Sequence, residues 1–305
     1  MNKSGIRLVR LTLEEVSDLP ILYEQVFGRK VDVNYFLEKY NAARLGNVFY
    51  GCCAYDGSLL VGYTGVRIRE LSWCGETRLS GESVDSMVHV EYRGNNLYRN
   101  LIEACQKILV SEGIPTFWGV PNEGSGHVLF NHVKWKRGVE LHRYMVPVQS
   151  RFLSLLMRLL NRSIRKGDAF MLFRTDKQPT PSFDQDQVIT LKREERVARK
   201  GFLLELEGLC FWVRVHRSVL YLGDMDTPDS LEHFKKGMAT LQGVAKKAGL
   251  TEIIFQTAPG SRLETLFNPC YPIYPSWTLA YQNLGDAWDL DHLRLTWGDL
   301  DTFEP

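Results

Sequence analysis

The sequence lacks the motifs of the commonest nucleotide-binding and metal-binding classes. It contains no Gly-x-x-x-x-Gly-Lys-Ser/Thr and no Gly-x-Gly-x-x-Gly segment, so nucleotide hydrolysis and dinucleotide binding receive little support. Its 6 cysteines form no Cys-x-x-Cys pair and no zinc-like grouping with histidine, so we expect no metal site. Most of these cysteines lie in apolar runs, where a cysteine acts as a small hydrophobic residue, and this favours a reducing compartment.

Long apolar runs and an excess of either charge are also missing. No apolar run reaches the roughly 18 residues that a membrane-spanning helix needs. The first five residues carry no apolar signal-peptide core. We therefore expect a soluble cytoplasmic protein with no transmembrane segment. The 37 basic and 36 acidic residues give a formal charge of +1, which argues against a dedicated nucleic-acid binder.

What the sequence does contain is a strand, a short polar turn and a helix in direct succession. Val84–Val90 is an apolar-rich run of strand length, and the turn after it includes Gly94, Asn95 and Asn96, which tolerate a left-handed backbone. Helical spacing then follows at Leu97, Leu101, Ile102, Cys105, Ile108 and Leu109. This order directs the N–H groups of the first helical turn at an anion such as phosphate, beside Arg93. An ordinary strand-to-helix loop is the alternative.

The stretch His89–Tyr98, followed by Leu101, resembles motif A of the GNAT superfamily of N-acetyltransferases, as found in bacterial members. Arg93 and Gly94 match the frequent Arg-Gly start, whereas Asn96 stands where glycine is usual and Tyr98 where a small residue is common. The resemblance implies acetyl-CoA (coenzyme A) as acyl donor, with its pyrophosphate on backbone amides. The cofactor-binding residues that it implies are Val88, His89, Val90, Arg93, Gly94, Asn95, Asn96, Leu97, Tyr98, Asn122 and Ser125.

The order of expected elements through residues 6–148 matches the fold of this family. We predict an α/β (α+β) fold with a mixed, mostly antiparallel central sheet flanked by helices. Within it, a capping box at Thr12 begins one helix that ends near Phe27, and residues 135–148 form two short strands. The resemblance implies that the fourth and fifth strands separate and that the pantetheine arm of the cofactor lies in the gap.

The second half of the chain repeats this order of elements. The expected elements are strands at 201–206, 209–215 and 218–222, a helix at 229–248, a strand at 251–257, a helix at 261–267, and strands at 277–282 and 294–297. We therefore predict tandem GNAT-like halves: a domain at 1–149 that binds acetyl-CoA, a connecting helix and linker at 150–190, and a degenerate domain at 191–305. Acidic Asp224 and Asp226 replace the Arg-Gly loop there and would repel a pyrophosphate. An unrelated α/β domain is the alternative.

Two features connect the halves. Residues 152–164 form an amphipathic helix surrounded by arginines. It could lie on a membrane surface, but its Leu-rich face favours an interdomain helix with solvated basic residues. Residues 175–187, which are rich in Pro and Asp, form the clearest linker.

Acetyl transfer to an amine needs a base for the amine's proton and a donor for the charge on the carbonyl oxygen. In the family the base is usually a Glu or Asp on or near the fourth strand, which implies Glu82, Asp85 or Glu91. Strand alternation places Glu82 and Asp85 on opposite faces, so only one can face the substrate unless a bulge intervenes. Each could instead be an ordinary solvated strand residue.

The leaving thiolate also needs an acid, which in the family is usually a tyrosine on the fourth helix. That position falls near Phe130, which cannot donate a proton. His127, His132 and Tyr144 are the substitutes, or solvent protonates the thiolate. The catalytic candidates are Glu82, Asp85 and His127.

The resemblance thus implies an N-acetyltransferase that moves an acetyl group from acetyl-CoA to the primary amine of a small molecule by direct attack. An amino sugar is one acceptor that it suggests, although no residue identifies it. The alternative is a non-catalytic protein of the same fold that senses a ligand or binds a partner protein. We expect no nucleic-acid partner, and a homodimer is one option for the oligomeric state.

Overall fold

A computed structural model describes residues 5–40, 49–160, 168–180, 183, 187–191 and 201–300. The chain divides into two compact units, which are described separately. Unit 1 comprises Met1–Leu71, Thr77–Gly138 and Thr278–Asp291, and unit 2 comprises Ser72–Glu76, Val139–Trp277 and His292–Pro305. Each unit therefore contains segments from both halves of the sequence.

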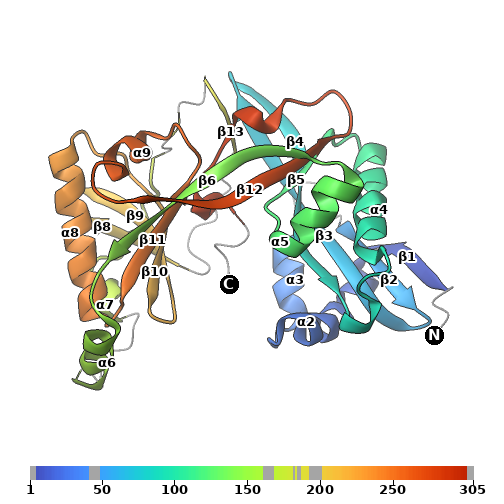
Figure 1. The fold of residues 1–305 in the computed structure, drawn as a ribbon, viewed down its shortest axis with the longest axis horizontal. Helices are drawn as coiled ribbons and strands as arrows, with labels where there is room; N and C mark the ends of the chain where they lie inside the picture. The colour runs from blue at the N-terminus through green and yellow to red at the C-terminus, as the bar shows by residue number, and fades with distance from the viewer. Residues whose placement is uncertain are drawn as a thin grey trace. The chain divides into compact units, whose positions relative to one another are not determined.

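Unit 1 is built on a sheet with the strand order β1-β2-β3-β4-β5-β12. The strands are β1 (Ile6–Arg10), β2 (Tyr50–Asp56), β3 (Leu59–Trp73), β4 (Glu76–Val88), β5 (Thr116–Gly119) and the C-terminal part of β12 (Ile273–Asn283). The helices are α1 (Leu13–Val16), α2 (Leu19–Phe27), α3 (Val33–Tyr40), α4 (Leu97–Ser111) and α5 (Glu123–Val128), with a 3-10 turn η2 (Val90–Tyr92) and a π-helical turn η3 (Leu129–Val133) (Figure 1). Strands β4 and β5 run parallel, whereas β1/β2, β2/β3 and β5/β12 are antiparallel.

Two hydrophobic cores cover the two faces of this sheet. Alternate residues of β2 separate them, because Cys52 packs with α4 and Cys53 packs with α1, α2 and α3. The α4 core includes Leu101 and Phe117, and the α3 core includes Phe36. Helices α3 and α4 therefore lie on opposite faces of β4, the strand that carries both carboxylate candidates.

The single helix predicted from Thr12 to Phe27 is wrong. The capping box at Thr12 is present, but α1 is only 4 residues long, and α2 begins after Asp18 with a proline in its first turn. Proline has no N–H and fits the start of a helix but not its interior, which explains the break. The predicted end near Phe27 is confirmed, because Gly28 in the αL conformation ends α2.

Unit 2 is built on a sheet with the strand order β6-β11-β10-β9-β8. The strands are β6 (Lys136–Pro147), β8 (Phe202–Leu206), β9 (Leu209–His216), β10 (Val219–Met225) and β11 (Glu252–Thr257). Off this path, β7 (Ile189–Leu191) and β13 (Leu293–Arg294) form a parallel pair. The helices are α6 (Arg151–Leu160), α7 (Asp168–Met171), α8 (Leu231–Lys247) and α9 (Arg262–Phe267), with 3-10 turns η4 (Leu290–His292) and η5 (Trp297–Asp299). Strands β10 and β11 run parallel, and the pairs β6/β11, β9/β10 and β8/β9 are antiparallel.

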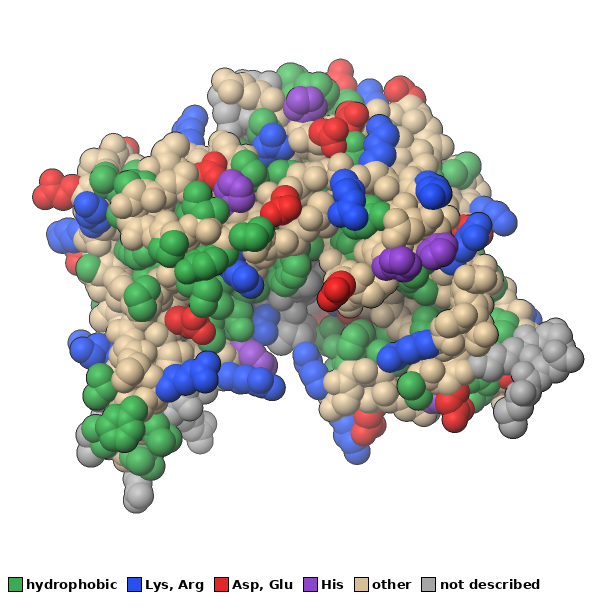
Figure 2. All heavy atoms as spheres, viewed as in Figure 1, with side chains coloured by type: hydrophobic (Ala, Val, Ile, Leu, Met, Phe, Trp, Pro, Cys, Tyr) green, Lys and Arg blue, Asp and Glu red, His purple; other side chains and the backbone are tan. Residues whose placement is uncertain are grey.

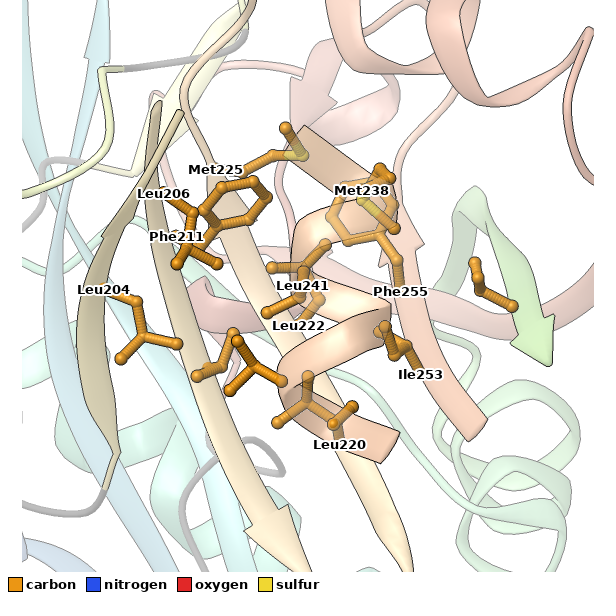
Figure 3. Packing of buried hydrophobic residues seen from close by; sticks show 14 of the residues in the cluster. Leu204, Leu206, Phe211, Leu220, Leu222, Met225, Met238, Leu241, Ile253 and Phe255 are labelled. Carbon is orange, nitrogen blue, oxygen red and sulfur yellow. The ribbon is translucent and has the colours of Figure 1, made fainter. Parts of the chain in front are cut away.

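Helix α8 packs across the sheet of unit 2. Leu241 and Met238 of this helix meet Leu222 and Phe255 from β10 and β11, as Figure 3 shows. The helical period of its apolar residues predicted this helix to within two residues at each end, and the Ser230 side chain caps its first turn.

Strand exchange between the sequence halves was not predicted. Residues 135–148 were expected to form two short strands, but β6 is one strand of 12 residues, which passes from unit 1 into unit 2 and pairs with β11. In unit 1 the neighbour of β5 is instead β12, from the second half of the sequence. Non-local pairing of this kind leaves no local sequence signal.

The remaining predictions have mixed outcomes. The final strand predicted at 294–297 is wrong, because β13 covers 2 residues and a 3-10 turn begins at Trp297. Helix α6 begins one residue before its predicted start at 152. The end of its predicted range, at 161–164, and much of the predicted linker at 175–187 lie outside the described residues. No described helix has the length and apolar character needed to cross a membrane. The mixed and mostly antiparallel sheet with flanking helices confirms the predicted fold class.

Candidate functional site

The loop between β4 and α4 has the backbone geometry of an anion-binding turn. Gly94 has a φ of 80° and Asn96 a φ of 57°, both left-handed. No described atom lies within 4 Å of the position where a Cβ on Gly94 would be, so the loop is open there. Asn96 is the N-cap of α4, but its side chain makes no capping hydrogen bond. The first N–H groups of this 15-residue helix therefore remain available for an external acceptor.

The other residues that the resemblance assigned to the cofactor lie around this loop. Leu97 is buried in the α4 core, Val88 packs against the same core, and Val90 is exposed. The Nε of Arg93 donates to the carbonyl of Val88 at 3.1 Å, which fixes this arginine beside the loop. His89 begins η2, and its Nδ1 accepts from the amide of Glu91 at 3.4 Å.

Strands β4 and β5 separate just before this loop. Only Gly81↔Phe117 and Glu82↔Trp118 are paired between the described residues of these two strands. Beyond them, Gly119 still lies close to Ser83, since a Cβ on that glycine would be 3.2 Å from the Ser83 carbonyl oxygen. The chain then leaves β5 for α5, and β4 continues to Val88. The separation between the strands opens toward the N-terminus of α4.

A bulge in β4 changes which side chains share a face. Asp85 has a φ of 47°, which is uncommon for a residue with a Cβ and incompatible with a regular strand. As a result, Val84 and Met87 both pack into the α3 core, although they are three residues apart. Arg67 faces the same side, since its β3 neighbours Val66 and Ile68 belong to the α4 core. The expectation that Glu82 and Asp85 lie on opposite faces is therefore wrong, and both face the side of α3.

Glu82 lies in a buried cluster with two arginines. Its Oε2 accepts from Nε and Nη2 of Arg67 at 2.9 and 2.6 Å and from Nη1 of Arg69 at 3.0 Å. All three side chains are nearly inaccessible, with exposed fractions of 3%, 7% and 2%. A carboxylate that two guanidinium groups hold away from solvent is poorly placed to take a proton from a substrate.

Asp85 lies in a polar and aromatic cluster beside α3. Its Oδ2 accepts from the hydroxyl of Tyr40 at 2.5 Å and pairs with Nζ of Lys39 at 2.7 Å. The same Nζ donates to the hydroxyl of Tyr35 at 3.2 Å. Burial, followed by the charge of Asp85, raises the pKa of Tyr35 above its usual value, so this phenol stays neutral. Tyr35 and Phe36 form an edge-on aromatic pair with ring centres 5.0 Å apart.

Tyr98 reaches across from α4 to both sides of the gap. Its hydroxyl lies close to the side chains of Ser86 on β4 and Ser125 on α5, which favour its ionised form less strongly than burial opposes it. Ser125 in turn bonds to Asn122, whose side chain caps α5. Burial raises the pKa of Tyr98, so its hydroxyl stays protonated. The sequence singled out Tyr98 only because a small residue is common at this motif position. That difference is the signal that could have identified Tyr98 as a site residue.

The three substitutes proposed for the missing acid make contacts of their own. His127 is exposed, and its Nδ1 lies 3.0 Å from Nδ2 of Asn131, while its ring is 5.4 Å from the ring of His132. The hydroxyl of Tyr144 donates to Oδ1 of Asn268 within unit 2. Phe130 packs under the guanidinium of Arg137 at 3.9 Å. No group of three His, Cys, Asp or Glu suited to a metal ion occurs in the described part of the chain.

Unit 2 contains a second pair of parallel strands that separate, but its own C-terminal segment fills the space. Strands β10 and β11 pair from Val219↔Glu252 to Leu222↔Phe255 and then separate at a bulge. Thr257 pairs with His142 of β6 on one edge, so the bridge that it makes to Thr296 lies on the edge that β10 has left. The next amide, of Ala258, donates to the carbonyl of Leu295 at 2.8 Å.

The inserted segment is tightly packed. The Trp297 ring meets Tyr221 of β10 with ring centres 4.8 Å apart. A Cβ on Gly298 would lie 2.5 Å from the ring of Trp212 and 3.2 Å from the backbone of Gly223, so no larger residue fits there. Leu295 and Leu300 are each 1% exposed, which leaves this gap closed.

The helix that follows β10 also differs from α4. The side chain of Ser230 accepts from the amide of His233 and so caps the first turn of α8. Asp226 is held by the amides of Thr180 and Cys210 at 2.8 and 2.7 Å. Unit 2 therefore has a bonded Asp226 carboxylate and a capped N-terminus of α8 at the place where unit 1 has an open loop.

Solved structures of similar fold give independent evidence. A GCN5-related N-acetyltransferase from Kribbella flavida matches with a TM-score of 0.56 at 14% identity, covering 92% of this chain and 72% of that one. A probable N-acyltransferase of unknown function from Enterococcus faecalis V583 gives 0.59 at 10% identity, covering 92% and 73%. A GCN5-related N-acetyltransferase from Anabaena variabilis ATCC 29413 gives 0.58 at 12% identity, also covering 92% and 73%. No protein-family model and no curated protein matches the chain. These similarities confirm the GNAT fold that the resemblance implied.

Proposed function

We propose that this chain, which has the fold of the GCN5-related N-acetyltransferases, moves an acetyl group from acetyl-CoA to the primary amine of a small molecule. The observation that supports this most directly is the open left-handed loop at Gly94–Asn96, which precedes an uncapped helix N-terminus beside two separating strands. An amino sugar is one candidate acceptor. The cytoplasmic location and a homodimer stay predictions.

The residues of the loop fit the diphosphate of the acyl carrier. The open space at Gly94 and the uncapped first turn of α4 supply N–H donors, and Arg93 adds a positive charge beside them. In this proposal Asn122 and Ser125 contact the pantetheine arm from the far side of the gap. When bound, acetyl-CoA supplies an activated thioester carbonyl.

Asp85 is the best placed of the candidate bases. The bulge projects it toward the aromatic side chains of α3, and its side chain is 10% exposed, whereas Glu82 is held by two arginines. A carboxylate beside tyrosine rings also suits recognition of a cationic amine, because such rings attract cations. We propose that the acceptor amine takes the place of the Lys39 ammonium on Asp85 and passes its proton to this carboxylate.

Tyr98 replaces the proton donor that Phe130 cannot supply. Its hydroxyl lies near Ser86 of β4 and Ser125 of α5, and burial keeps it protonated. A neutral phenol in this position donates a hydrogen bond to the sulfur or the carbonyl oxygen as negative charge develops there. His127 is then a surface residue without a part in the reaction.

Calorimetric titration with coenzyme A and acetyl-CoA tests the proposal. We expect binding to the intact chain and at least a tenfold loss in Arg93→Glu, because this change removes the positive charge beside the loop and repels the diphosphate. Arg10→Glu is the matched control, since Arg10 pairs at 2.7 Å with Glu112, which follows the opposite end of α4. An absence of heat with the intact chain at high micromolar ligand contradicts the proposal.

A non-catalytic ligand-sensing protein is the second candidate, favoured by Phe130 and by the pairing of both carboxylates. Consumption of acetyl-CoA in the presence of a panel of amines separates the two functions. If coenzyme A binds but no amine accelerates thioester loss, the sensing function is supported and the enzymatic one is not.

A further inference from the structure

Helix α6 reverses the usual orientation of an amphipathic helix. A surface helix of a globular protein normally turns its apolar side toward the core. Among the side chains of α6 that the structure describes, the buried one is Ser154, whose Oγ donates to the carbonyl of Gly249. The exposed ones include Phe152 at 74%, Leu153 at 47%, Leu155 at 57%, Leu156 at 40% and Leu159 at 53%. Figure 2 shows these hydrophobic side chains gathered over α6, at the lower left of the view.

The apolar residues of α6 occupy one side of the helix. Phe152, Leu156 and Leu159 are spaced by four and three residues, so they lie above one another, and Leu153 adjoins them. The opposite side carries Ser154, the residue that attaches the helix to unit 2. The exposed apolar strip is therefore a consequence of how the helix is attached.

Positive charge accompanies this strip. Between residues 151 and 166 the sequence contains no Asp or Glu, and its basic residues are Arg151, Arg158, Arg162, Arg165 and Lys166. Of these, Arg151 lies at the start of α6 and is exposed. Lys246 and Lys247 at the end of α8 are exposed and lie close by, because α6 is bonded to Gly249.

We propose that α6 lies in the surface of an anionic lipid bilayer, with Phe152, Leu156 and Leu159 between the headgroups and the acyl chains. An apolar strip flanked by basic residues, on a helix too short to span the bilayer, is the pattern of an interfacial helix. Arg151 of α6 and Lys246 and Lys247 at the end of α8 would contact the lipid phosphates. A second copy of this chain is a poor occupant, because it would bring the same positive charges against each other.

Sedimentation of the full-length protein with vesicles tests this proposal. We expect binding to vesicles of phosphatidylcholine with phosphatidylglycerol, and little binding to phosphatidylcholine alone. Changing Phe152, Leu156 and Leu159 together to Ser should lower partitioning by at least about tenfold. Changing Arg151 to Gln should lower it by about fivefold, and added salt should weaken binding by the intact chain.

The matched control is the double variant Leu13→Ser and Ile21→Ser, which removes two apolar side chains that are 65% and 62% exposed in unit 1. It should bind vesicles as the intact chain does. The proposal is overturned if the intact chain does not sediment with anionic vesicles, or if the control loses as much binding as the α6 variant. A shift of the α6 variant from dimer to monomer in light scattering without lipid also overturns it, because a second copy would then cover this face.

Discussion

Replacing Glu82 distinguishes a structural carboxylate from a catalytic one. Three hydrogen bonds from Arg67 and Arg69 converge on a single oxygen of Glu82, at distances of 2.6 to 3.0 Å, and all three side chains are buried. Glu82→Gln keeps the shape of the side chain and removes the negative charge that the two guanidinium groups share. Removing one partner from a buried ion pair costs about 3–5 kcal/mol. We expect Glu82→Gln to lower the free energy of unfolding by about 3 kcal/mol.

Asp85→Asn is the comparison that makes this measurement decisive. Asp85 is also paired, but Asn can keep the hydrogen bond from Tyr40, so we expect a stability loss of only about 1 kcal/mol. As the proposed base, however, Asp85 should contribute about a hundredfold or more to kcat. Urea unfolding measures the first quantity, and acetyl-CoA consumption at saturating acceptor measures the second.

The opposite pattern refutes this reasoning. If Glu82→Gln unfolds at the same urea concentration as the unchanged chain and yet loses activity, Glu82 acts on the substrate and the arginines orient it. If Asp85→Asn keeps full activity, the cluster of Asp85 and Lys39 only supports the structure. Neither result can be explained by a variant that fails to fold, because the unfolding curve is recorded for each.

Three further predictions follow from the two units. Tyr98→Phe keeps the ring but removes the hydroxyl that lies near Ser86 and Ser125, so kcat should fall by about tenfold with little change in the KM for acetyl-CoA, as steady-state kinetics would show. Calorimetry should give one coenzyme A per chain, because the inserted C-terminal segment closes the second gap; a stoichiometry of two contradicts this. Burial raises the pKa of Cys52 from 9.0 to about 11, so folding favours its neutral thiol. Its contribution to stability is complete below pH 9 and is lost as the pH rises toward 11, and urea midpoints across this range should fall less in Cys52→Ala.

Local patterns in the sequence predicted the elements that depend on local physics. Helix α8 was located closely because its apolar residues have a regular helical period and Gly249 follows its last turn. The loop at Gly94 was identifiable for the same reason, since glycine and asparagine directly encode its left-handed backbone.

The features that could not be predicted depend on non-local contacts or on irregular backbone. Counting residues along β4 assumes regular alternation, and the left-handed Asp85 breaks it, which moved two carboxylates to one face. The arginine partners of Glu82 come from β3. The alternation of side chains along one strand does not show which residues of a neighbouring strand they contact. The sequence showed Tyr98 only as one position of a motif. Tyr98, Ser86 and Ser125 lie on three different elements, so the motif could not show that they lie close together.

Both units contain a pair of parallel strands that separate, but the gap between the strands is closed in one unit and open in the other. In each, two parallel strands pair briefly and then separate, with a helix between them in the chain. The separation exposes backbone groups that need partners, because unpaired buried N–H and C=O groups are costly. In unit 2 the chain's own residues 295–300 supply these partners and Ser230 caps the helix, so the unit is complete by itself. In unit 1 the Tyr98 hydroxyl lies near both Ser86 and Ser125, while Asn96 leaves the helix uncapped. An external ligand with a diphosphate and a hydrogen-bonding arm would complete unit 1 in the way that the C-terminal segment completes unit 2.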